Sequence, residues 1–160
     1  EMEEKISKYV QDRFTSDGDF FYFKLHGSYG WLTSDGTDLM VLGDFKEKQI
    51  EEEPLLNWYY GCFKELLFRD GIKILIIGYS FNDSHINKII KEAIDNFGLK
   101  FCILTPGIHI DTQLALISAF ELNDGLFKAF PYSLAQLFPE DQSPSAYLPE
   151  ILEVFPNNRG

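Results

Sequence analysis

The most regular pattern of apolar and polar positions predicts a strand–helix–strand unit over residues 73–104. Lys73–Ile77 is a β-branched apolar run without polar alternation, which is typical of a strand buried on both faces. Residues 83–98 then show helical spacing between an aspartate suited to an N-cap and a glycine suited to a helix end. Lys100–Leu104 is a second apolar run. The unit predicts an α/β fold with a parallel sheet flanked by helices.

The amino-terminal part of the chain predicts further elements. Residues 3–13 show helical spacing, and residues 20–25 form an aromatic run that predicts a buried strand. A loop is expected at His26–Ser28, and a short strand or hairpin partner over residues 39–42. Glu51, Glu52, Glu53 and Pro54 indicate the start of a helix that ends before Asp70 and Gly71, with the glutamates near the positive end of the helix dipole. We interpret the three glutamates as a helix start and not as a metal site.

The carboxyl-terminal part is less regular. The pattern predicts a helix over 112–121 with Asp111 as its cap, a short strand over 126–130 and short helices over 133–138 and 145–155. With 160 residues and no repeats or linkers, a single domain over 1–160 is expected.

Composition and charge exclude several classes of protein. The chain carries 25 acidic and 14 basic residues, and a net charge of −11 repels phosphate backbones, so direct binding to nucleic acid is not expected. No apolar run is long enough for a membrane span, and the acidic start is unlike a signal peptide, so a cytoplasmic location is expected. Cys62 and Cys102 are too few for a structural zinc site. Their apolar surroundings favour buried thiols, with a disulfide as the alternative.

Small and polar residues follow three of the predicted strands, at residues 26–28, 78–80 and 105–107. Ligands bind at the carboxyl ends of strands in open parallel sheets. Glycine lets a ligand approach the backbone, and serine and threonine offer hydroxyl groups to a ribose or a phosphate. The helix start at Ser84 adds N–H donors that suit an anion. The pattern therefore predicts a nucleotide site.

Two segments resemble a known family. Residues 24–31, KLHGSYGW, resemble the catalytic-histidine segment of sirtuin-like domains, and residues 76–86, IIGYSFNDSHI, resemble the second signature of their bacterial branch. With the helix after Pro54 between them, the resemblance covers about residues 20–105. It implies a Rossmann-like, sirtuin-type fold and a chemistry that uses NAD.

The resemblance also implies roles for particular residues. Domains of this branch are chiefly NAD hydrolases of bacterial anti-phage defence, whereas true sirtuins use NAD to deacylate lysine. His26 matches the family histidine, which acts as a base on the ribose hydroxyls, and the alternative is a core histidine that bonds to a backbone carbonyl. Gly78 and Ser80 match the residues that hold the ribose–phosphate part of NAD, and Thr105 falls where the family contacts the adenosine ribose. Tyr79 and Asn82 complete the expected NAD-binding set, with stabilisation of the turn alone as the alternative for Asn82.

The chain departs from the family pattern in two ways. It lacks the four cysteines of the sirtuin zinc module, which favours NAD hydrolysis without a metal over protein deacylation. It also has no Gly-x-Gly string before His26. We therefore expect the carboxyl-terminal portion of a sirtuin-like domain that lacks its first Gly-rich βαβ unit, within a larger, homo-oligomeric protein. The alternatives are an NAD-dependent protein deacylase and a non-catalytic nucleotide-sensing or oligomerisation module.

Other candidate residues have simpler interpretations. His85, in the first helical turn after Asp83, is expected to be structural, and His109 is expected in a surface loop. Tyr29 and Trp31 either line the nicotinamide side of a pocket or pack in the core, and core packing is favoured.

Overall fold

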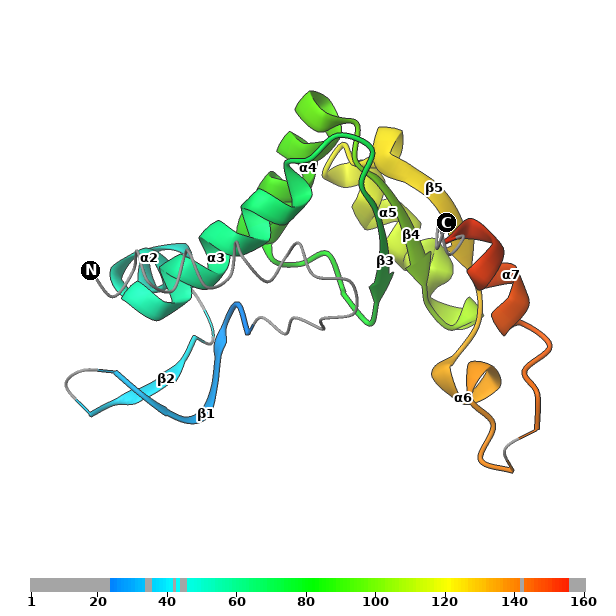
Figure 1. The fold of residues 1–160 in the computed structure, drawn as a ribbon, viewed down its shortest axis with the longest axis horizontal. Helices are drawn as coiled ribbons and strands as arrows, with labels where there is room; N and C mark the ends of the chain where they lie inside the picture. Colours follow the sequence, from blue (N-terminus) through cyan, green and yellow to red (C-terminus); the bar gives the residue numbers. More distant parts are fainter. Residues whose placement is uncertain (1–23, 34–35, 42, 44–45, 142, 156–160) are drawn as a thin grey trace, which may run out of the picture. The chain divides into compact units, whose positions relative to one another are not determined.

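The structure, a computed structural model, describes residues 24–33, 36–41, 43, 46–141 and 143–155 (Figure 1). The chain divides into two compact units, Glu1–Glu65 and Leu66–Gly160. The helix expected over 3–13 and residues 20–23 of the predicted aromatic strand lie outside the described residues. The single domain expected for residues 1–160 stays a prediction.

The first unit contains an antiparallel hairpin. Strand β1 (Gly27–Leu32) pairs with β2 (Asp38–Met40), so the hairpin partner expected near residue 39 is confirmed. The loop expected at His26–Ser28 is wrong in its extent, because the chain enters β1 directly after His26. The reason is the positive φ of Gly27, +76°, which completes a tight turn and lets strand pairing begin at once.

Two consecutive helices follow the hairpin, α2 (Lys46–Glu52) and α3 (Pro54–Leu67). The helix start expected at Pro54 is confirmed, and Glu53 lies at this start as expected, because its carbonyl oxygen accepts the Asn57 N–H at 2.9 Å. The expected position is wrong for the other two glutamates. Glu51 and Glu52 end α2 instead of opening α3, since proline lacks the N–H that would continue the first helix. The small core of this unit comprises Leu39, Val41, Ile50 and Leu56, with Trp31 and Tyr60 packed against it.

The second unit is built on a three-stranded parallel sheet in the order β3 (Lys73–Ile77), β4 (Lys100–Leu104) and β5 (Leu126–Phe130). Helix α4 (Ser84–Phe97) connects β3 to β4 and ends at Gly98, whose φ of +65° is left-handed. The predicted strand–helix–strand unit is therefore confirmed. Its parallel strands and crossover helix give a mixed α/β, Rossmann-like fold.

Burial differs between the strands of this sheet. In β4, residues 101–104 are all buried, as expected for a central strand. In β3, by contrast, Ile74, Leu75 and Ile76 are only half-buried, so the expectation of burial on both faces is wrong for this strand. Within the described residues β3 pairs with β4 alone, and an edge strand keeps part of its surface open.

Short helices complete the second unit. A 3₁₀ turn, η1 (Gly107–His109), leads into α5 (Ile110–Ala119), and η2 (Asn123–Gly125) precedes β5. Helix α5 begins earlier than the predicted helix over 112–121, so Asp111 lies in its first turn and the cap expected there is wrong. The expected carboxyl-terminal helices are confirmed as α6 (Leu134–Leu137) and α7 (Leu148–Val154). Buried side chains of the sheet and these two helices form one core: Cys102, Leu104, Phe130, Leu137 and Ile151. Among the helices described, none is long and apolar enough to cross a bilayer.

Candidate functional site

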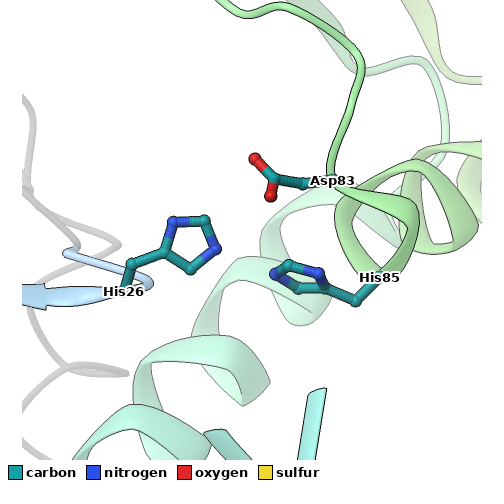
Figure 2. Close-up of side chains that lie close together, drawn as sticks. All are labelled: His26, Asp83 and His85. Carbon is teal, nitrogen blue, oxygen red and sulfur yellow. The ribbon is translucent and has the colours of Figure 1, made fainter. Parts of the chain in front are cut away.

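In the first unit, His26 is held by the backbone of the β1–β2 hairpin. Its carbonyl oxygen accepts a hydrogen bond from the Val41 N–H at 2.9 Å, and the Gly27 N–H donates to the Lys24 carbonyl oxygen at 3.1 Å. A Cβ on Gly27 would lie 2.0 Å from the Leu39 carbonyl oxygen, which is far inside contact distance. The turn therefore requires glycine after the histidine. The His26 imidazole leaves this turn half-buried (Figure 2).

The two aromatic residues near His26 differ in their surroundings. Trp31 packs against the core of the first unit, and its ring centre lies 5.9 Å from that of Tyr59. The core packing expected for Trp31 is therefore confirmed. Tyr29 is 87% exposed, so core packing is wrong for this residue. The pairing of β1 with β2 shifts register between Gly27 and Leu32, so the regular alternation of faces along a strand does not hold between Tyr29 and Trp31.

In the second unit, the loop that follows β3 contains the predicted Gly–Tyr–Ser motif. Gly78 has a φ of +68°, and Phe81, although it is not glycine, also has a positive φ, of +57°. The Phe81 side chain is fully buried, whereas Ser80 and Asn82 are exposed. The loop thus uses one aromatic ring as an anchor and presents two polar side chains to solvent.

Side chains from two helices hold this loop. The Asn87 side chain in α4 donates to the Phe81 carbonyl oxygen at 2.8 Å and accepts from the Tyr79 hydroxyl at 2.8 Å. The Tyr79 hydroxyl also lies 3.1 Å from the Asp83 carbonyl oxygen. From α5, the Gln113 amide donates to the Tyr79 carbonyl oxygen at 3.1 Å. The loop conformation is therefore fixed by its own neighbours.

Thr105 lies beside this loop at the same edge of the sheet. Ile77 pairs with Leu104 in the parallel register, so Gly78 and Thr105 directly follow two paired residues. The Thr105 N–H donates to the Phe130 carbonyl oxygen at 3.1 Å, which extends the ladder between β4 and β5. The structure thus brings the predicted motif and Thr105 together at the carboxyl ends of β3 and β4.

The start of α4 follows the loop directly. Asp83 occupies the N-cap position, as expected, but its side chain makes no capping hydrogen bond. His85 is buried in the first turn, and the structural role expected of it stays a prediction. Figure 2 shows both side chains at this end of the helix. His109 lies exposed in η1, as the sequence predicts.

His26 and Ser80 belong to different units. The predicted shared site, with the two residues less than about 15 Å apart, therefore stays a prediction. The absence of a metal stays a prediction as well.

Both cysteines are free and buried, as predicted. Burial raises the pKa of the Cys62 thiol to about 11, with a further contribution from the charge of Glu65. Burial also raises the pKa of Cys102, against the opposing effect of Lys73 and Lys128. Since the thiolate is the nucleophilic and metal-binding form, neither residue is a candidate for catalysis at neutral pH.

Asn87 and Gln113 are residues of this region that the sequence reasoning misses. Asn87 stands three and seven residues before Ile90 and Ile94, so it lies on the apolar face of α4 and is only 2% exposed. A polar residue at such a position must find hydrogen bonds inside the protein, and that signal is visible in the sequence. Gln113, half-buried in α5, gives no comparable signal.

Comparisons with known proteins bear on the family of this chain. Searches of curated proteins and of solved structures found no match. A family model, described as SIR2-like domain, matches residues 1–125, more than three quarters of the chain. The match includes His26, the loop after β3 and Thr105. The chain therefore belongs to the SIR2-like domain family.

Proposed function

We propose that this domain hydrolyses NAD to ADP-ribose and nicotinamide in bacterial anti-phage defence, as part of a larger protein. Membership of the SIR2-like family supports an NAD-related function and an NAD-dependent enzyme activity. The observation that carries the proposal is the loop from Gly78 to Asn82, which follows β3 beside Thr105 and leads into α4. Nucleotides bind at this position in open α/β sheets.

In this proposal the loop binds the ribose–phosphate part of NAD. The left-handed Gly78 has no atom within 4 Å of its Cβ position, so a ligand can approach the backbone there. Tyr79 contributes its backbone, and the exposed side chains of Ser80 and Asn82 offer a hydroxyl and an amide to ligand oxygens. Thr105 is the proposed contact of the adenosine ribose, although only 2% of this residue is exposed beside the loop.

His26 is the catalytic residue in the proposed reaction. The bond between the ribose C1′ and the nicotinamide nitrogen breaks, water supplies the oxygen that bonds to C1′, and one proton is released. An imidazole with a pKa near 6.5 can accept a proton from a ribose hydroxyl at cellular pH. The tight turn at Gly27 fixes the backbone from which this imidazole extends.

Protein deacylation is the alternative reaction of sirtuin-type domains. This chain has two cysteines, both buried and with raised pKa values, so it cannot form a four-cysteine zinc module of its own. That difference favours small-molecule NAD hydrolysis over the deacylation of a protein.

The first prediction tests the reaction and the role of His26 together. The full-length protein, incubated with NAD and no acyl peptide, should release nicotinamide and ADP-ribose, measured by liquid chromatography. His26→Ala should lower the rate by about 10²–10⁴, the usual contribution of a positioned acid–base group. The matched control is His109→Ala, which replaces an exposed histidine in η1 and should retain the wild-type rate.

The outcomes separate the alternatives. Nicotinamide release that requires an acyl-lysine peptide would establish the deacylase instead. An unchanged rate in His26→Ala would remove this histidine from the mechanism. No turnover in any condition, with NAD still bound, would favour the non-catalytic nucleotide-sensing module.

A further inference from the structure

We infer that Asn87 is a positioning residue, which fixes the loop from Gly78 to Asn82 in the conformation that presents Ser80 to the ligand. This inference deepens the proposed function and rests on it for the identity of the ligand, NAD. It concerns a residue in α4 that has no direct place in the expected NAD-binding set.

Both ends of the Asn87 side chain are used by the loop. Its nitrogen donates to the carbonyl oxygen of Phe81, and its oxygen accepts from the hydroxyl of Tyr79, each at 2.8 Å. These two partners are the residues on either side of Ser80. A single side chain from α4 therefore holds the loop before and after the residue that is expected to contact NAD.

The backbone conformation of Phe81 explains why the loop needs the hydrogen bonds from Asn87. A φ of +57° is uncommon for a residue with a side chain and persists only where its surroundings impose it. The Phe81 ring is fully buried, and its centre lies 4.9 Å from the Tyr79 ring and 6.2 Å from the Phe101 ring. The ring fixes one side of the residue, and the hydrogen bond from Asn87 fixes its carbonyl group.

Because Asn87 is buried, water cannot readily take over its hydrogen bonds to the loop. Its side chain is 2% exposed, and a buried hydrogen-bonding group that loses its partner is costly to leave unsatisfied. Loss of Asn87 would leave the Phe81 carbonyl oxygen without this donor. We expect the loop then to relax from its left-handed conformation and to move Ser80.

The test measures kcat and KM for NAD separately in the full-length protein. Asn87→Ala should raise KM by about tenfold, which corresponds to the loss of one to two hydrogen bonds that keep the loop in its ligand-binding conformation. The same variant should change kcat by less than about threefold. A purely structural role would instead lower the fraction of folded enzyme, which lowers kcat and leaves KM unchanged. The matched control is Asn96→Ala, an exposed asparagine on the same helix, which should change neither constant.

A milder variant covers the case in which Asn87→Ala does not fold. Tyr79→Phe removes one hydroxyl and keeps the ring, so it should raise KM by about threefold. An unchanged KM in the folded Asn87→Ala variant, or in Tyr79→Phe if the former is unfolded, would overturn the inference.

A second measurement separates this inference from the proposed function. If the wild-type protein releases no nicotinamide, the proposed function fails, and hydrogen exchange then decides the role of Asn87. Amides of residues 79–82 should exchange at least about tenfold faster in Asn87→Ala, or in Tyr79→Phe if the former is unfolded, than in Asn96→Ala. Those of β4 should keep their protection. Equal exchange in the loop would show that Asn87 does not hold it.

Discussion

Gly27 shows how closely the backbone constrains the residue after His26. Its φ of +76° suits glycine, and a Cβ there would also collide with the Leu39 carbonyl oxygen, which is itself part of the hairpin and cannot move aside. Gly30, in the same strand, has nearly the same φ, +79°, but nothing within 4 Å of its Cβ position. Alanine substitutions at the two glycines therefore separate the cost of a left-handed backbone from the cost of a steric overlap.

We predict that Gly27→Ala lowers the free energy of unfolding by about 2–4 kcal/mol, because a steric overlap adds to the left-handed penalty. Gly30→Ala should lower it by only about 1 kcal/mol, the conformational term alone. Urea denaturation followed by circular dichroism measures both. Equal losses in the two variants would mean that the hairpin adjusts to the added methyl group.

At the scale of elements, the Glu150 carboxylate of α7 binds one side chain of β5 and one of the segment that follows β5. Glu150 accepts a hydrogen bond from the Tyr132 hydroxyl at 2.6 Å and forms an ion pair with Lys128 at 2.8 Å. The hydrogen bonds from Lys128 and Tyr132 lower the pKa of Glu150, and the bond to Glu150 raises the pKa of Tyr132. Both shifts favour a charged Glu150 beside a neutral Tyr132.

This arrangement predicts a pH dependence. A carboxyl with a lowered pKa in the folded state stabilises the fold above its unfolded pKa, and this contribution is lost as pH falls through the folded pKa. Glu150→Gln should therefore unfold at lower urea than the wild type at pH 7, and the difference should shrink below about pH 4.5, near the unfolded pKa. Glu153→Gln, an exposed change on the same helix, is the control. A difference that stays the same size from pH 7 down through the acid range would contradict the assignment.

Local patterns predict β3, α4 and β4 well, because a β-branched run, helical spacing and a closing glycine all indicate the same unit. Other features depend on contacts between distant residues. The start of β1 at Gly27 follows from a turn that packs on Leu39, and no local pattern encodes that contact. The roles of Asn87 and Gln113 depend likewise on where the loop after β3 runs. The candidate residues were therefore predictable from motifs, but the side chains that hold them were not.

At the scale of the whole molecule, the chain carries no Gly-x-Gly string before His26 that would supply N–H donors to a pyrophosphate. Charge-assisted hydrogen bonds contribute about 1.5–3 kcal/mol each, so the lack of two weakens binding by about two to four decades. We predict that the 160-residue chain alone binds NAD only in the millimolar range. Calorimetry measures this directly, and a micromolar dissociation constant would show that these residues already hold the full phosphate site.

The position of β5 has a practical consequence for anyone who shortens this protein. The family match ends at residue 125, and β5 begins at Leu126, yet β5 supplies all the hydrogen bonds on one side of β4. A polypeptide cut at residue 125 would leave that side of β4 as an open edge and uncover the apolar face that includes Cys102 and Leu104. Open strand edges recruit other chains, so such a protein is a candidate for aggregation during expression. Residues 126–155 should be retained with the SIR2-like domain in any recombinant version.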